Sequence, residues 1–180
     1  MTKQLAKEKT MRQNNPNKII IHHTADVSLN TQFNSVDSDH KRRWNFISKL
    51  GYYCGYHYFI ERDGEVIQAR LDTDEGAHTI GQNTESIGIA LAGNFNLQLP
   101  TAKQRNALVV LIDKLCEKWN ISPKRIYPHR AFQNKDCYGT NLSDVWAKDT
   151  YLDFKNGTTV NILWLCRAGI ESLLKRYEKQ

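Results

Sequence analysis

Three sites in this 180-residue sequence stand out as possible zinc ligands, the first of them a pair of adjacent histidines. His22 and His23 are adjacent near the N-terminus, His129 lies more than a hundred residues later, and Cys137 follows His129 after a short loop. Zinc binds imidazole nitrogen and thiolate sulphur, and a catalytic zinc keeps three protein ligands and one open position for water. Two histidines and one cysteine meet that count. The spacing between His129 and Cys137 is long enough to turn both side chains onto one ion.

Only one of the two adjacent histidines can belong to such a site. Three consecutive isoleucines at 19–21 predict a short buried strand that ends in His22 and His23. Because successive side chains of a strand point to opposite faces of the sheet, alternation alone leaves open which imidazole faces the site. A single strand-end histidine is often structural, and a single loop cysteine is often an inert buried thiol. The prediction therefore depends on the three ligands occurring together.

The elements that would position these residues are strands interspersed with helices. The expected strands are residues 19–23, 56–60, 65–69 and 86–92, and the expected helices are residues 38–50, 100–119 and about 158–176. An Asp-Gly pair at 63–64 predicts a hairpin turn between the second and third strands. Residues 130–141 are expected to form an irregular loop. This order predicts an α/β fold, a single domain in which helices flank a central mixed β-sheet, with an extra C-terminal helix.

The positive charge is concentrated at the N-terminus. Residues 1–18 carry five lysine or arginine side chains and one glutamate, which leaves about +2 of the net +6 for the rest of the chain. We therefore predict a flexible basic arm at 1–17 and one domain at 18–180. Because the domain is close to neutral, no nucleic-acid partner is expected, since that partner would require a dense basic face.

The apolar segments and the cysteines of the sequence predict the cellular compartment of the protein. No segment approaches the roughly 20 uninterrupted apolar residues of a membrane span, so no stable membrane insertion is expected. The first 18 residues hold no apolar run of the kind a secretory signal requires. Four cysteines without such a signal favour a reducing compartment. We therefore expect a cytoplasmic protein with free or metal-bound thiols.

Four blocks of sequence occur in the order typical of one family of metal hydrolases. They are IIIHHTA at 19–25, GYHYFI with RDG at 55–64, GAHT with Asn83 and SIGI at 76–89, and PHR at 128–130. Over residues 18–142 these blocks resemble the zinc-dependent N-acetylmuramoyl-L-alanine amidases, the amidase and peptidoglycan-recognition-protein family. In that family the first histidine of the pair is the ligand. The resemblance thus implies one Zn²⁺ per chain, held by His22, His129 and Cys137.

Two positions near the last ligand set this chain apart within the family. The family usually has a Cys-Pro-Gly turn, whereas Tyr138 here stands between Cys137 and Gly139, which removes the fixed φ of proline. Lys135 resembles the lysine of the small phage lysozyme-amidases, where many animal relatives have threonine. The chain therefore resembles the phage branch. Residues 143–180 match no family block and are expected to form a C-terminal helical extension.

The resemblance implies hydrolysis of the amide bond between N-acetylmuramic acid and L-alanine in peptidoglycan. It assigns Tyr56 and Lys135 as catalytic residues, and it points to His78 and Asn83 as contacts to the glycan or stem peptide. Each assignment has an ordinary alternative. Tyr56 lies in an aromatic run that could pack the sheet, Lys135 could be a solvated loop residue, and Asn83 could be a turn residue. His57 points opposite Tyr56 on its strand and is expected to be structural.

These inferences lead to an expected phage-type endolysin, a monomer that stays in the cytoplasm until a separate membrane-permeabilising protein releases it to the cell wall. A cytoplasmic amidase that recycles wall fragments would need the same residues. A peptidoglycan-recognition module without catalysis is the alternative from another class. Cys137 and Lys135 argue against it, because some relatives that only bind have lost the cysteine. A regulatory protein partner on the N-terminal arm is a further alternative that only the arm's position favours.

Overall fold

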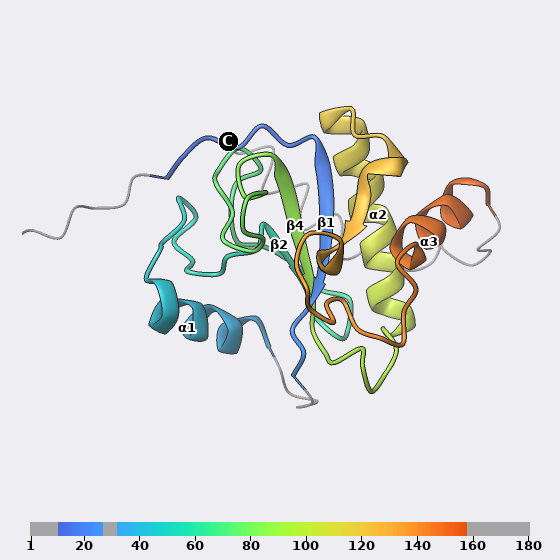
Figure 1. The fold of residues 1–180 in the computed structure, drawn as a ribbon, viewed down its shortest axis with the longest axis horizontal. Coiled ribbons are helices and arrows are strands. Elements are labelled where there is room, and N and C mark those ends of the chain that lie inside the picture. The colour runs from blue at the N-terminus through green and yellow to red at the C-terminus, as the bar shows by residue number, and fades with distance from the viewer. Residues whose placement is uncertain (1–10, 27–31, 158–180) are drawn as a thin grey trace, which may run out of the picture.

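A five-stranded mixed β-sheet forms the centre of the computed structural model, which describes residues 11–26 and 32–157 (Figure 1). The strands are β1 Lys18–His23, β2 Tyr58–Ile60, β3 Val66–Gln68, β4 Ser86–Leu91 and β5 Ile126–Pro128. They lie in the order β3-β2-β4-β1-β5. β1 pairs in parallel with both β4 and β5, β2 pairs in parallel with β4, and β3 pairs antiparallel with β2. The carboxyl ends of β1, β4 and β5 therefore meet at one edge of the sheet.

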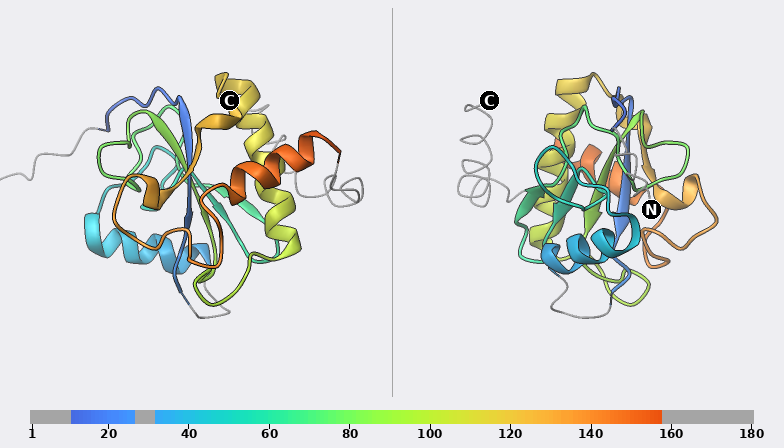
Figure 2. Two further views of the ribbon diagram at one scale, coloured as in Figure 1. Left: turned by 45° about the vertical axis from the view of Figure 1, so that its right-hand side comes forward. Right: turned by 90° about the vertical axis from the view of Figure 1, so that its left-hand side faces the viewer.

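Helices cover both faces of this sheet (Figure 2). The α-helices of the described chain are α1 Phe33–Trp44, α2 Ala102–Trp119 and α3 Trp146–Lys155, and 3-10 turns at Pro123–Arg125 and His129–Ala131 flank β5. α2 and α3 contact each other and share a core with Ile19 and Ile87. On the other face, Phe33 of α1 packs against Phe59 and Ala90. The predicted α/β fold, a single domain with helices flanking a central mixed sheet, is confirmed.

The long helix α2 begins where the sequence predicts because side chains satisfy its first free N–H groups. The Thr101 hydroxyl accepts the backbone N–H of Gln104 at 3.0 Å, and Gln104 Oε1 accepts the backbone N–H of Thr101 at 3.1 Å. Such a reciprocal capping box stabilises a helix N-terminus by about 1 kcal/mol. Asn120 ends the helix in a left-handed conformation. Leu108 and Ile112 on its inner face are fully buried in the core.

The first helix differs from the expected range of 38–50. It spans Phe33–Trp44 and ends at Asn45, which has a φ of 46°. The apolar residues that favoured a later helix do not point into the core, because Trp44 is 49% exposed and Ile47 is 50% exposed. Their three-residue spacing is therefore a surface pattern. Helix α1 instead buries Phe33, which lies before the expected start of the helix at residue 38.

Other boundaries also shift. The strands expected at 56–60 and 65–69 are shorter, since only residues 58–60 and 66–68 pair across the hairpin. Helix α3 lies within the expected helical extension at 143–180, but its own bounds were not predicted, because only two of its residues, Ala147 and Tyr151, are buried and leave a weak apolar pattern. The helix expected at 158–176 lies outside the described residues.

The chain is already packed against the rest of the domain several residues before residue 18, the expected start of the domain. The backbone N–H groups of Asn14 and Asn15 donate to the carbonyls of Thr73 and Thr84 at 2.7 and 3.0 Å, and the Asn14 side chain is buried. Arg12 Nη2 forms a salt bridge with Glu75 Oε1 at 2.5 Å. This segment is held by polar contacts rather than by apolar burial, so hydropathy gave no signal. Residues 1–10 of the predicted basic arm lie outside the described residues.

Within residues 11–26 and 32–157, no helix has both the length and the apolar surface that a membrane crossing would require.

Candidate metal centre

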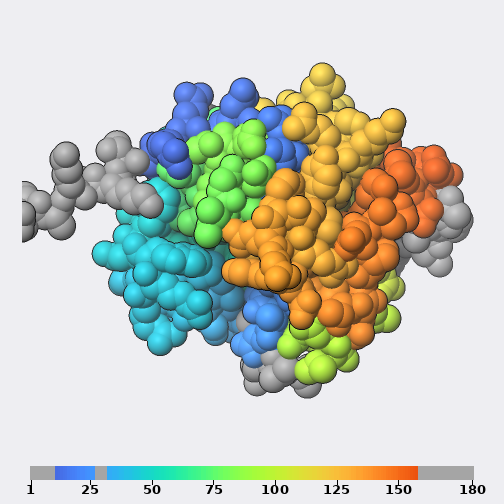
Figure 3. Space-filling model, in the orientation of Figure 1, coloured from blue at the N-terminus to red at the C-terminus, as the bar shows by residue number. Residues whose placement is uncertain are grey.

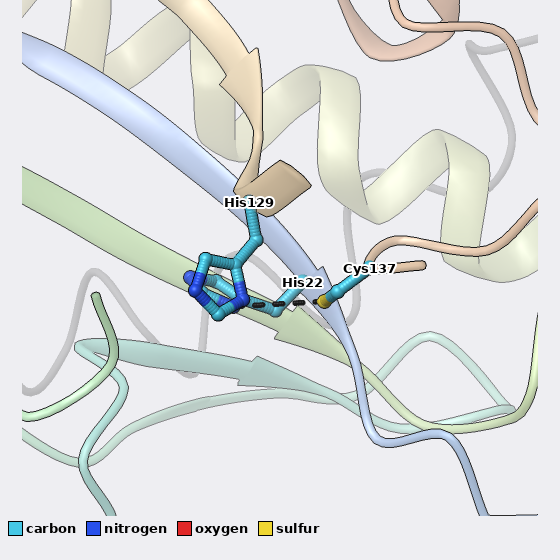
Figure 4. A group of neighbouring side chains, drawn as sticks. All are labelled: His22, His129 and Cys137. Atoms are coloured by element: carbon cyan, nitrogen blue, oxygen red, sulfur yellow. Dashed lines mark hydrogen bonds between the residues drawn. The ribbon is translucent and has the colours of Figure 1, made fainter. Parts of the chain in front are cut away.

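Two neighbouring strands bring the distant ligand candidates together. His22 is the fifth residue of β1, and His129 follows the last residue of β5 directly. The two strands pair in parallel, with Ile21 beside Pro128, so both histidines lie at the same edge of the sheet. The loop after β5 then returns Cys137 to this edge, where Figure 4 shows its sulphur directed at the ring of His22.

The three side chains lie at distances that fit one zinc ion. One donor atom from each of His22, His129 and Cys137 lies within 4.8 Å of the others, and Cys137 Sγ is 3.8 Å from His22 Nδ1. A tetrahedral zinc with bonds of about 2.0–2.3 Å separates its protein donors by roughly 3.3–3.6 Å. Small side-chain movements would close the set around an ion. Two imidazoles and one thiol are also the donor types that zinc prefers, so the residues present fit it.

The structure assigns the two adjacent histidines to opposite faces. His22 lies beside His129, with 4.4 Å between ring centroids. The imidazole of His23 points away, where its Nδ1 accepts the backbone N–H of Phe95 at 3.0 Å. His23 contributes to the site through its backbone N–H, which lies 3.4 Å from Cys137 Sγ and donates to the sulphur. The side chain available as a ligand is therefore that of His22.

Tyr138 holds the cysteine loop by packing rather than by the fixed φ of proline. Its ring is fully buried, and its hydroxyl donates to the carbonyl of Ser143 at 3.0 Å. Arg130 lies over the ring at 5.3 Å and donates to the carbonyl of Gly139 at 2.7 Å. The backbone N–H of Arg130 also donates to the carbonyl of Cys137 at 2.7 Å. The arginine of the PHR block thus fixes the loop on which the cysteine sits.

Burial sets the protonation of the ligand candidates. It lowers the pKa of His22 well below its ordinary 6.5, and the neighbouring His78 and His129 lower that pKa further. Burial also lowers the pKa of His129, while a hydrogen bond to Gln133 opposes the shift. Both imidazoles are therefore neutral near pH 7, the form that binds metals. Burial raises the pKa of the Cys137 thiol to about 11, so zinc binding would release its proton.

The two predicted catalytic residues lie beside this cluster. The ring of Tyr56 is half-buried, 5.0 Å from the ring of His22. Burial raises the pKa of its hydroxyl well above the ordinary value of 10, so the group stays protonated. Lys135 is exposed, and its positive charge lowers the pKa of His22, His129 and Cys137. The segment that carries it, orange in Figure 3, forms part of the molecular surface beside the green and cyan segments.

The two residues predicted to contact the substrate, His78 and Asn83, have different surroundings. Asn83 Oδ1 accepts the backbone N–H groups of both His78 and Thr79, at 3.0 and 2.9 Å, as a turn residue does. The His78 ring faces the metal cluster, with its Nδ1 3.1 Å from His22 Nε2. His57 is structural, as expected, because it is fully buried and its Nδ1 accepts the backbone N–H of Gly88 at 3.0 Å.

Comparison with known proteins decides the family. The profile of N-acetylmuramoyl-L-alanine amidases matches residues 12–140, well over half of the chain, and this range contains all three ligand candidates. The chain belongs to the N-acetylmuramoyl-L-alanine amidase family. The match also begins at residue 12, which agrees with the packed segment that precedes β1.

The chain is similar both to proteins named as amidases and to proteins named as peptidoglycan-recognition proteins. The peptidoglycan-recognition protein SC2 of Drosophila melanogaster is 31% identical over 139 residues, 76% of each chain. The endolysine N-acetylmuramoyl-L-alanine amidase LysCS from Clostridium intestinale is 28% identical, with a TM-score of 0.69 over 85% of this chain and 93% of that one. A Drosophila PGRP-LB mutant in complex with tracheal cytotoxin is 26% identical, with a TM-score of 0.62 over 75% and 83% of the chains.

Sequence reasoning missed the residues that support the ligands of this family site. Gln133 Oε1 lies 3.0 Å from His129 Nε2, and Thr79 Oγ1 lies 3.4 Å from His22 Nε2. Arg130 was recognised only as part of a block. Thr79 and Arg130 lie inside the quoted blocks, so their side-chain partners could have been sought there. The position of Gln133 carried no such signal, because an isolated glutamine in a loop has no distinctive pattern.

Proposed function

We propose that this chain is a zinc-dependent amidase that hydrolyses the bond between the lactyl group of N-acetylmuramic acid and L-alanine in peptidoglycan. The convergence of His22, His129 and Cys137 at one sheet edge carries this proposal, because it is the ligand count of a catalytic rather than a closed structural zinc site. Membership of the amidase family supports the bond and the substrate.

His22, His129 and Cys137 would hold the zinc. An amide is a poor electrophile and water a poor nucleophile at neutral pH, and zinc supplies Lewis-acid polarisation of the carbonyl and activation of water. The rest of the chemistry belongs to side chains around the ligands. The burial of the ligand candidates keeps water away and the local dielectric low, so each charge near the reacting bond acts strongly.

Tyr56 and Lys135 are placed to stabilise the charge that develops on the carbonyl oxygen. The Tyr56 hydroxyl stays protonated because burial raises its pKa, and it can donate a hydrogen bond to an oxyanion. Lys135 brings a compact positive charge close to the ligands from the solvent side. In this proposal both residues act on the transition state, and Asn83 contributes mainly by shaping the turn that borders the site.

The same site residues and the similar proteins support a proposal for the biological role of the enzyme. Lys135 and the similarity to the endolysine LysCS favour a phage-type endolysin, monomeric and cytoplasmic until it is released to the wall. Recognition without cleavage is the second candidate, favoured by the similarity to peptidoglycan-recognition proteins. The presence of Cys137 in reach of both histidines favours catalysis over binding alone.

Digestion of purified peptidoglycan by the zinc-loaded full chain tests the proposal. We expect new L-alanine amino termini and no new reducing sugar ends, because the recognised site lacks the paired carboxylates of a glycosidase. The Cys137→Ser variant serves as the control for a contaminating hydrolase. New reducing ends would identify a different bond. Retention on peptidoglycan with no new termini would establish the recognition module instead.

A further inference from the structure

The nitrogen of His22 that points away from the metal cluster has its own partners. His22 Nδ1 faces Cys137 Sγ at 3.8 Å, whereas His22 Nε2 lies 3.1 Å from His78 Nδ1 and 3.4 Å from Thr79 Oγ1. A neutral imidazole carries one proton, so one ring nitrogen donates and the other offers a lone pair. Which nitrogen of His22 can bind a metal therefore depends on what its neighbours require.

Ser86 determines the proton position on His78. The Ser86 hydroxyl lies 2.7 Å from the carbonyl oxygen of Gln82, which can only accept, so its single proton is committed there. Ser86 Oγ can then only accept from His78 Nε2, 3.5 Å away. The proton of a neutral His78 is therefore on Nε2, and His78 Nδ1 is an acceptor.

The acceptor on His78 in turn determines the proton position on His22. His78 Nδ1 is also within 3.0 Å of the Thr79 hydroxyl, which can donate to it. If the Thr79 hydroxyl donates to His78 Nδ1, His22 Nε2 can donate to Thr79 Oγ1. If it does not, His22 Nε2 donates to His78 Nδ1. In both cases His22 Nε2 must carry the proton. The lone pair of His22 is left on Nδ1, the nitrogen that faces Cys137.

Gly76 and Gly88 leave the space that the His78 ring occupies. A Cβ at Gly88 would lie 2.5 Å from Cδ2 of the His78 ring, and a Cβ at Gly76 would also lie 2.5 Å from that atom. Any larger residue at either position would displace the ring. His57 packs on it with 5.6 Å between ring centroids, and His57 is itself fixed by the backbone of Gly88.

We propose that His78 is a positioning residue for the metal ligand His22, as the middle of a hydrogen-bond chain from Ser86 through His78 to His22, in place of the substrate contact expected from the sequence. This chain fixes the His22 tautomer with its lone pair on Nδ1. Outer partners of this kind orient a ligating imidazole and increase its affinity for the metal. The inference rests on the proposed metal site but not on which bond the protein cuts.

Long-range ¹H–¹⁵N NMR on the metal-free full chain tests the tautomers directly. We expect the rings of His22 and His78 both to be protonated on Nε2 at neutral pH. A proton on Nδ1 of either ring would overturn the proposal. This measurement needs neither zinc nor turnover, so its outcome is independent of whether the wild-type chain cleaves peptidoglycan.

Variants of His78 test the consequence for zinc. The Oδ1 atom of asparagine can occupy the place of Nδ1 and accept from His22, whereas leucine cannot. We expect His78→Leu to bind zinc about 10- to 100-fold more weakly in a chelator competition, and His78→Asn to remain close to wild type. If His78→Leu binds zinc with wild-type affinity while KM for peptidoglycan fragments rises, His78 is a substrate contact and the proposal is wrong.

Discussion

Cys137 Sγ lies 3.8 Å from His22 Nδ1, although the two residues are 115 positions apart in the sequence. Their approach results from the parallel pairing of β1 with β5, which places His129 next to His22 and starts the loop that returns Cys137. The backbone N–H of His23 donates to the same sulphur, so the edge of β1 supplies both an imidazole and a donor to the cysteine. This relationship places the loop that carries Lys135 beside the ligands.

Replacing Lys135 by alanine should remove a charge that acts on the transition state while leaving all three ligands. We expect kcat to fall on the order of 10²–10³-fold, the effect of losing one oxyanion-stabilising group, with zinc content unchanged. Lys124→Ala, an exposed lysine at the opposite end of β5, is the matched control and should keep wild-type kcat. Loss of zinc in Lys135→Ala would indicate a structural role, and wild-type kcat would show that the lysine is dispensable.

Tyr56→Phe should remove one hydroxyl and leave the ring packed near His22. Because burial keeps this hydroxyl protonated, its loss removes a hydrogen-bond donor rather than a base. We expect kcat to fall on the order of 10²-fold, with the pH profile otherwise unchanged and zinc retained. Tyr53→Phe, whose ring instead lies under Lys41, should behave as wild type. Equal kcat in the two variants would remove Tyr56 from the mechanism.

Gln133 should support the second histidine ligand. Its Oε1 accepts from His129 Nε2 at 3.0 Å, which leaves Nδ1 of that ring for the metal. We expect Gln133→Ala to weaken zinc binding about 10-fold in a chelator competition. Gln133→Glu keeps an acceptor and should bind zinc at least as tightly as wild type. A wild-type zinc affinity in Gln133→Ala would mean that the loop backbone alone orients His129.

His40 should make stability depend on pH. Burial lowers its pKa from the ordinary 6.5 to about 4, and its Nδ1 accepts the backbone N–H of Gly55 at 2.8 Å. The unfolded chain therefore takes up a proton near pH 6.5 while the folded chain does not. The contribution of neutral His40 to the free energy of unfolding is complete above pH 6.5. It is lost as the pH falls towards 4, by up to about 1.4 kcal/mol per pH unit.

The variant His40→Asn isolates this effect, because asparagine can still accept from Gly55 but does not titrate. Chemical unfolding of both proteins is measured between pH 4 and 7 in the same excess of chelator. The free energy of unfolding of the variant should depend less steeply on pH, by a slope that corresponds to about one proton fewer taken up on unfolding. Identical slopes of the free energy of unfolding against pH would show that His40 does not contribute to this pH dependence.

The extended segments that carry the two histidine candidates could be predicted from the sequence because they depend on local patterns, whereas the choice of His22 over His23 required the family resemblance. The isoleucine run before His22 specifies a buried strand, and the PHR block follows another extended segment. Helix α1 could not be placed correctly, because Trp44 and Ile47 have helical spacing but lie half-exposed. The packed segment before β1 escaped notice since asparagine side chains, not apolar ones, attach it to the body.

The contacts around the ligands could not be predicted for a different reason. The chain from Ser86 to His78 to His22 joins residues from β4, a turn and β1, and only the pairing of β1 with β4 brings them together. Nothing in the sequence around His78 distinguishes a partner of His22 from a contact to the substrate. The tautomer of a ligand depends on which hydroxyl protons are already committed, and that requires three-dimensional positions.

X-ray absorption at the zinc edge on the zinc-loaded full chain tests the central claim most directly. The account predicts one zinc per chain with two nitrogen ligands at about 2.0–2.1 Å, one sulphur at about 2.3 Å and one further light atom. Cys137→Ser should lose the sulphur signal and most of its zinc. A folded wild-type chain that takes up no zinc, or a bound zinc without a sulphur ligand, would contradict the account.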